Sequence, residues 1–231
     1  MNFPAQAIFF AFFGGALPAS IWLWFWLKED SAHPEPRGLI VLTFLSGMVA
    51  VILVLPFQKI VYSLFGGSTF TLFLLWATLE ELFKFGAAYI VALRNKAVDE
   101  PIDMIIYMVT AALGFVALEN TLFLLNPLFN GHFIDGLLTG NLRFIGTSLL
   151  HIISSATVGI FMAFAFYNDK KIKLLYLWGG LIVSVVLHTL FNLSIIENNG
   201  NNTFITFSVL WISVIGLLLF FEKIKTLNLG H

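Results

Sequence analysis

The sequence lacks cysteine and is poor in charged residues, and each shortage excludes a class of protein. Without cysteine, the 231-residue chain has no disulfide framework, no thiolate metal site and no cysteine nucleophile. Charged residues make up 11% of the chain, less than half of the roughly 25% that is typical of soluble domains. Because 59% of the residues are hydrophobic, a soluble globule of this size would expose too much apolar surface. The composition therefore predicts a protein of the lipid bilayer and excludes soluble enzymes.

Seven stretches of the chain are long and apolar enough to cross a bilayer as helices, which takes about 20 residues each. No internal repeat or low-complexity linker separates them, so we expect one transmembrane domain over residues 1–231. The predicted fold class is all-α, a polytopic membrane helix bundle with about seven transmembrane helices, between six and eight. The expected spans are 5–27, 38–57, 69–93, 104–126, 142–167, 174–195 and 203–221.

The basic residues predict how the chain is oriented in the membrane. Lysine and arginine gather in alternate loops and in the C-terminal tail, whereas the remaining loops hold only Lys59 and Arg143. Since basic residues favour the cytoplasmic side, we expect the N-terminus outside and the C-terminus in the cytoplasm. The chain has 12 basic and 13 acidic residues, and this balance gives nucleic acid no electrostatic footprint.

Several ionisable residues lie inside the expected spans, where a charge costs several kcal/mol and marks a functional site by default. At a rise of about 1.5 Å per residue, they fall within one or two helical turns of a common depth. Groups that share a depth on four neighbouring helices are able to share one water-filled cavity. The residues concerned are Glu80, Glu81, Lys84, Glu119, His151 and His188.

The spacing of these residues indicates which of them face the same way. Glu80 and Lys84 are four residues apart with the acid first, which is the better order for an ion pair on one helix. Glu81 points about a quarter-turn away and needs a different partner. His188 and Asn192 are again four residues apart and share one helix face.

Carboxylates and imidazoles at membrane depth suit the hydrolysis of an amide. A desolvated glutamate is a candidate general base, and a nearby imidazole or carboxamide donates hydrogen bonds to a developing oxyanion. The same residue types also ligate zinc or iron, so the residues alone leave a metal open. The chain contains neither a His-Glu-x-x-His motif nor a Gly-x-Ser-x-Gly elbow, which argues against ordinary zincins and serine hydrolases.

Two other classes of function are compatible with buried charges. A proton- or cation-coupled transporter would use them as a relay, although paired Gly/Pro-interrupted spans are missing. A catalytically idle immunity or scaffold protein would retain the residues and use them to bind a membrane partner.

Four motifs in order on successive spans carry a resemblance to a known family. Residues 80–84 match Glu-Glu-x-x-Lys and residues 115–120 match Phe-x-x-x-Glu-Asn, followed by the isolated His151 and by the segment 188–192. Together, over residues 80–192, they resemble the PrsW family of intramembrane proteases, which is related to the CAAX prenyl endopeptidases and bacteriocin-processing proteins.

The resemblance implies a protease of the bacterial plasma membrane that makes the first cut in a single-span anti-sigma factor during envelope-stress signalling. Glu81 is then the expected general base and Glu119 its partner in holding the water. The cofactor stays open between none and a divalent metal such as Zn²⁺, whose ligands would be Glu81, Glu119, His151 and His188. The implied catalytic residues are Glu80, Glu81, Glu119, His151, His188 and Asn192, with Lys84, Glu100 and Asn120 in support.

Overall fold

The computed structural model describes residues 3–29, 33–129, 133–196 and 203–227. All regular elements within these ranges are helical, which confirms the predicted all-α fold class. The elements are α1 (Phe3–Glu29), α2 (Arg37–Phe65), α3 (Thr69–Ala88), the π-helical turn η1 (Tyr89–Leu93), α4 (Pro101–Phe129), α5 (Phe133–Phe164), α6 (Lys170–Ile196) and α7 (Thr203–Leu227).

Six of the described helices are long and apolar enough to cross a membrane, namely α1, α2, α4, α5, α6 and α7. The helix α3 is not among them, because Glu80, Glu81 and Lys84 lower its mean hydropathy. A polytopic bundle of seven helices, six of them candidate spans, agrees with the architecture expected from the sequence. The charged helix α3 carries three of the six ionisable residues expected at membrane depth, more than any other helix.

The helix α2 continues well beyond the end expected at residue 57. Pro56 lies inside the helix and does not end it, and the next turns run on to Phe65. The backbone N–H of Gly66 then donates to the carbonyl of Tyr62 at 2.9 Å and closes the last turn. Proline removes one backbone hydrogen bond, but helices in membranes tolerate it because neighbouring groups satisfy the freed carbonyl.

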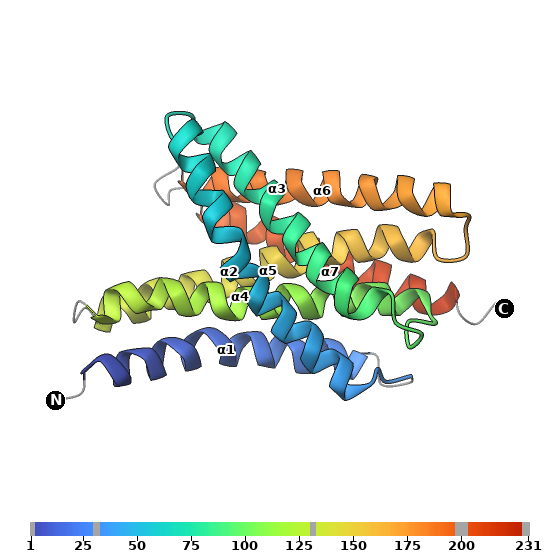
Figure 1. Ribbon diagram of the computed structural model, residues 1–231, viewed down its shortest axis with the longest axis horizontal. Helices are drawn as coiled ribbons and strands as arrows, with labels where there is room; N and C mark the ends of the chain where they lie inside the picture. The colour runs from blue at the N-terminus through green and yellow to red at the C-terminus, as the bar shows by residue number, and fades with distance from the viewer. Residues whose placement is uncertain (1–2, 30–32, 130–132, 197–202, 228–231) are drawn as a thin grey trace.

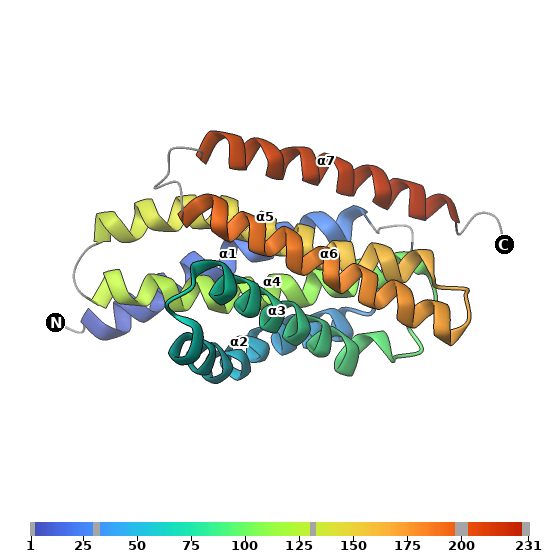
Figure 2. The same ribbon diagram turned by 90° about the horizontal axis from the view of Figure 1, so that it is seen from above.

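The helix α4 forms the centre of the bundle. In its apolar span 89% of the residues are buried, compared with 17% in α1 and 28% in α7. It packs against α5, α1 and α2, and Figure 1 shows the α2–α3 hairpin crossing α1 and α4 obliquely. In Figure 2, α7 covers one edge of the bundle and the α2–α3 hairpin lies at the opposite edge.

Two glycines allow α2 to cross α4 with the backbones almost in contact. A Cβ atom at Gly114 would lie 1.9 Å from the carbonyl oxygen of Phe44, and one at Gly47 would lie 2.0 Å from that of Ala111. Close approach of this kind requires residues without side chains, and small residues are common where membrane helices pack. The crossing fixes α2, and with it α3, against the central helix.

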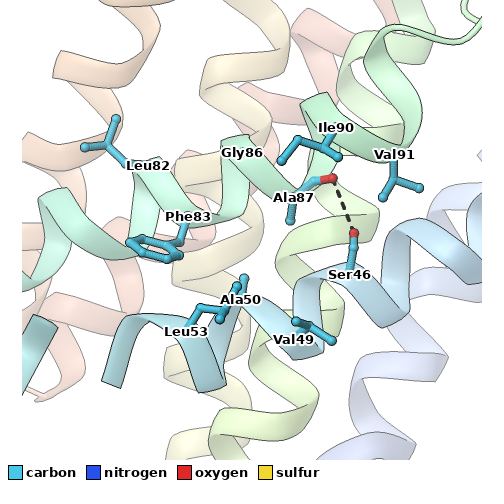
Figure 3. A pocket seen from close by; sticks show the side chains of 10 residues that line it. All are labelled: Ser46, Val49, Ala50, Leu53, Leu82, Phe83, Gly86, Ala87, Ile90 and Val91. Carbon is cyan, nitrogen blue, oxygen red and sulfur yellow. Dashed lines mark hydrogen bonds between the residues drawn. The ribbon is translucent and has the colours of Figure 1, made fainter. Parts of the chain in front are cut away.

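The lipid-facing side of the hairpin carries an apolar groove between α2 and α3, shown in Figure 3. Its volume is about 490 Å³, and Gly86 leaves open space on the α3 wall. The hydroxyl of Ser46 spans the groove floor and donates to the carbonyl of Ala87 at 3.4 Å. The charged residues of α3 lie on its buried face and are absent from the groove lining.

Candidate active site

The helices α3, α4, α5 and α6 bring the membrane-depth ionisable residues together. On α3 these residues continue the buried stripe formed by Leu72, Phe73 and Ala77, so the face that packs is also the face that carries charge. All but one of them are at least nine-tenths buried. The cluster consists of Glu80, Glu81 and Lys84 from α3, Glu119 from α4, His151 from α5 and His188 from α6.

The carboxylate of Glu81 is the most heavily bonded group of the cluster. Its Oε1 atom contacts the ammonium of Lys84, lies 2.8 Å from Nδ1 of His188 and accepts a hydrogen bond of 2.9 Å from the hydroxyl of Ser154. The hydroxyl of Ser155 reaches Oε2 at 3.5 Å. Because a buried charge is tolerated only when it is paired and hydrogen-bonded, this shell lets the glutamate stay ionised.

The spacing of Glu80 and Lys84 allows an ion pair between them, but the ammonium of Lys84 contacts Glu81 instead. Lys84 extends toward α5, where it also lies 2.8 Å from Nδ1 of His151. Glu80 turns toward α2 and α6: its Oε1 atom accepts a hydrogen bond of 2.7 Å from Gln58, and Oε2 lies 3.5 Å from Nε2 of His188. The two acids thus share His188 and differ in their other partners.

The partners of the two histidines assign them opposite tautomers. An ammonium only donates, so Nδ1 of His151 accepts from Lys84 and Nε2 carries the hydrogen, which points at Glu119 over 3.3 Å. His188 faces two carboxylates, and its shorter contact, 2.8 Å from Nδ1 to Glu81, is the one we assign to the N–H donor. Its Nε2 atom is then a hydrogen-bond acceptor that faces Oε2 of Glu80.

The exposure of the three acids separates their roles. The side chain of Glu81 is 0% exposed, whereas those of Glu80 and Glu119 are 8% and 18% exposed. Oε1 of Glu81 is fully engaged and Oε2 receives only the 3.5 Å contact from Ser155, whereas Oε2 of Glu80 has no hydrogen-bond partner among the described residues. Glu80 is therefore a second candidate for the role of base, beside the Glu81 expected from the sequence.

Three buried polar side chains beside the cluster lack a hydrogen-bond partner among the described residues. Asn120 follows Glu119, while Ser148 and Ser184 lie about one turn before the two histidines on α5 and α6. Buried polar groups are normally satisfied, by water where no protein group is available. These side chains therefore support a hydrated site, and Asn120 stays in the supporting position that the sequence predicts.

Two of the implied site residues lie outside this cluster. Glu100 contacts His33 at 3.0 Å and precedes α4, so it lies 19 residues or about 28 Å from Glu119 along the helix direction. Asp103 rather than Glu100 caps α4, accepting from the backbone N–H groups of residues 99 and 100. Asn192 lies one turn beyond His188 and is half-buried, and no hydrogen bond from it to the cluster occurs within the described ranges.

Gln58 and Ser154 bond to the two adjacent acids, Glu80 and Glu81, and neither was predicted from the sequence. Gln58 is followed by Lys59, and together they resemble the end of a span. A polar residue directly after the expected end of an apolar stretch, here residue 57, is the signal that points to Gln58. Ser154 gives no such signal, because serine on a membrane helix often bonds to its own backbone.

The residues of the cluster fit a divalent cation. Glu80, His151 and His188 each offer one ligand atom, and these atoms lie within 4.8 Å of one another. Two ligands of a tetrahedral ion at about 2.0–2.1 Å lie about 3.3–3.4 Å apart, close to the 3.5 Å between Glu80 and His188. This group of three differs from the four ligands expected, because Glu80 takes the place of Glu81 and Glu119 is not part of it.

A bundle of candidate membrane helices that gathers two imidazoles and three carboxylates has the residue types that an intramembrane hydrolase needs. Residues 35–219 match the family described as PrsW family intramembrane metalloprotease. The chain belongs to the PrsW family of intramembrane proteases. Membership favours the protease expectation over the transporter and the idle immunity or scaffold protein.

Curated relatives carry the same family name. Protease PrsW of Geobacillus kaustophilus (strain HTA426) is 30% identical over 186 residues, which cover 77% of this chain and 76% of the relative. Protease PrsW of Bacillus subtilis (strain 168) is 30% identical over 183 residues, covering 75% and 77%. Protease PrsW of Clostridioides difficile (strain 630) is 23% identical over 175 residues, covering 73% and 72%. No solved structure matches the chain.

Proposed function

We propose that the chain hydrolyses a peptide bond of a membrane-anchored protein with a water molecule activated by Glu80 and His188. One observation carries the proposal: Oε2 of Glu80 and Nε2 of His188 face each other at 3.5 Å, and with the tautomer assigned to His188 and an ionised Glu80 both atoms are hydrogen-bond acceptors. Two acceptors do not bond each other, but a water molecule between them donates to both. Donation of both hydrogens raises electron density on the water oxygen and prepares it for attack.

The reaction follows from the positions of the donors and acceptors. The water oxygen bonds to the scissile carbonyl carbon while one water proton passes to Glu80. The Nε2–H group of His151, which faces Glu119 at 3.3 Å, is our candidate donor to the developing oxyanion. The carbon–nitrogen bond then breaks, and the proton on Glu80 passes to the leaving amine. Glu81 and Lys84 take no part in the bond changes and fix the orientation of the two imidazoles.

The family description names a metal, and the cluster has suitable ligands for one. Glu80, His151 and His188 would hold a divalent cation such as Zn²⁺, and His151 would join them only if its Nε2 hydrogen moved to Nδ1 and the ammonium of Lys84 no longer donated there; the cation would supply Lewis-acid activation of water and of the scissile carbonyl. Glu81 would then act on the ligand His188 through the Nδ1–H hydrogen bond, as carboxylates do behind metal-binding histidines.

We propose a single-span membrane protein of the anti-sigma factor type as the substrate, and the bacterial plasma membrane as the location. Glu80 lies 11 residues into α3 and Glu119 lies 10 residues before the end of α4, which places both about 15–17 Å from the same end of the bundle. With the N-terminus outside, as the basic residues predict, that end is extracytoplasmic. The cut would then fall in the outer half of the substrate's transmembrane segment.

Cleavage by purified protein in proteoliposomes tests the proposal. A single-span bacterial anti-sigma factor is the substrate. The variants Glu80→Gln and His188→Ala are compared with native protein. Glu222→Gln serves as the matched control, because Glu222 is an exposed acid of α7. We expect both cluster variants to lose at least about 100-fold in kcat/KM, the lower end of the effect of general-base catalysis. Undiminished cleavage by Glu80→Gln would overturn the assignment.

A further inference from the structure

The side chain of Gln58 makes a connection unlike any other described on α2. The hydroxyls of Thr43, Ser46 and Ser63 all bond to backbone carbonyls, mostly of their own helix. The carboxamide of Gln58 instead reaches α3 and donates to Oε1 of Glu80 at 2.7 Å. A polar side chain inside the membrane is costly, and one that is kept there has a partner or a function.

The hydrogen bond from Gln58 decides which oxygen of Glu80 is free. It occupies Oε1, so Oε2 is the atom presented to His188 at 3.5 Å. At 2.7 Å this contact has the length of a charge-assisted hydrogen bond, which is stronger and more directional than a neutral one. Glutamine is suited to the task because its amide always donates, whereas a second acid would repel Glu80.

The backbone at Gln58 is held by the same face of α3. The indole N–H of Trp76 donates to the carbonyl of Gln58 at 3.0 Å, and the ring of Trp76 stacks on that of Tyr62. Trp76 and Glu80 are four residues apart on α3 and therefore lie on one face. One residue of α2 thus accepts from Trp76 through its backbone and donates to Glu80 through its side chain.

We infer that Gln58 is a positioning residue for hydrolysis, which sets the carboxylate of Glu80 by a two-point attachment of α2 to α3. The inference rests on the proposed function and adds a requirement to it. The reactive orientation of Glu80 depends on a helix that contributes no other residue to the cluster. The packing of α2 against α3 is therefore required to assemble the site.

Kinetics of Gln58→Met test the inference, because methionine keeps an unbranched chain of similar length and removes the donor. Misplacing a reacting group by about 1 Å lowers the reaction rate on the order of 100-fold. We therefore expect kcat to fall roughly 10- to 100-fold. KM should change by less than about twofold, since Gln58 acts on Glu80 and not on the whole substrate. Ser46→Ala, which removes another α2–α3 hydrogen bond, should keep native kcat.

A second variant guards against a simple loss of folding. Gln58→Glu keeps the size of the side chain and donates only while it is protonated, so its deficit relative to native protein should widen as pH rises. Native kcat in Gln58→Met, or a deficit in Gln58→Glu that does not change with pH, would overturn the inference. Glu80→Gln is measured in parallel: full activity in that variant would refute the proposed function itself, whereas its loss beside an active Gln58→Met refutes only the role of Gln58.

Discussion

Replacing Lys84 with methionine measures how strongly the buried charges stabilise one another. The ammonium of Lys84 contacts Glu81 and lies 2.8 Å from His151, and both partners of the ion pair are fully buried. Methionine keeps most of the length of the side chain and removes the charge. The variant leaves the carboxylate of Glu81 with its neutral partners and without a countercharge. We expect the bundle to lose stability because an unpaired buried charge is costly.

The magnitude follows from a comparison inside the same chain. Removing one partner of a buried ion pair costs about 3–5 kcal/mol, whereas an exposed pair is worth about 0–1 kcal/mol. Lys225 and Glu222 form an exposed pair with the same three-residue spacing, at 2.7 Å and with 31% and 62% exposure. Lys84→Met should therefore cost at least about 2 kcal/mol more than Lys225→Met.

Reversible unfolding in mixed micelles, followed by tryptophan fluorescence, gives the free energy of unfolding of each variant. The double variant Glu81→Gln with Lys84→Met removes both charges, so its cost should be well below the sum of the two single costs. Equal losses in Lys84→Met and Lys225→Met would refute the reasoning. Strict additivity of the two substitutions at Glu81 and Lys84 would also refute it, since it would mean that the pair is not coupled.

Three further outcomes are expected. Gly114→Ala should lower the thermal unfolding midpoint because its Cβ would lie 1.9 Å from a carbonyl oxygen of α2. Gly86→Ala, with open space around it, should raise the midpoint by the equivalent of up to about 1 kcal/mol. Similar midpoints for the two variants would contradict the close crossing of α2 and α4. Ser154→Ala should lower the free energy of unfolding by about 1.5–3 kcal/mol, because it removes the hydrogen bond to Glu81. The exposed Ser213→Ala should lower it by about 0.5 kcal/mol or less. Chemical unfolding of both variants measures the difference. A divalent cation held at the site should be lost from His188→Ala and retained by Glu222→Gln, which elemental analysis of purified protein detects; retention by His188→Ala would exclude that histidine as a ligand.

Much of the bundle was predictable because lipid imposes a simple rule on the sequence. Apolar stretches of about 20 residues give the helices, and the predicted all-α class is confirmed. Ends were harder to predict, since hydropathy reports contact with lipid and not helix formation. The helix α2 passes Pro56 and Lys59 and continues to Phe65, and α5 begins at Phe133 rather than at 142.

The members of the cluster were predictable because ionisable side chains are energetically unfavourable inside a membrane, but the way they pair was not. Glu80, Glu81, Glu119, His151 and His188 all carry groups that lipid penalises, and the structure brings all five together. Which acid faces which partner depends on how α3 is rotated against α2, α5 and α6. The sequence of α3 alone does not determine that rotation. Lys84 could reach either acid by its spacing, and tertiary packing decides for Glu81.

Residues outside the cluster show the limits of motif reasoning. Glu100 is one of the implied supporting residues, yet it lies just before the N-terminal end of α4 and contacts His33. Gln58 belongs to no motif, yet it holds a member of the cluster at 2.7 Å. A neutral polar side chain costs less free energy in a membrane than a charged one, so its presence in a span does not by itself indicate a functional site. Its contacts in the folded protein identify it.

An experimental structure in a lipid nanodisc, at a resolution that shows ordered water, examines most directly whether four helices assemble one hydrolytic centre. We predict density for a water molecule, or for a metal ion with its water, within bonding distance of both Oε2 of Glu80 and Nε2 of His188. His151 and Glu119 should remain in contact beside it. Glu80 and His188 turned toward separate surroundings, with no shared density between them, would contradict the proposed centre.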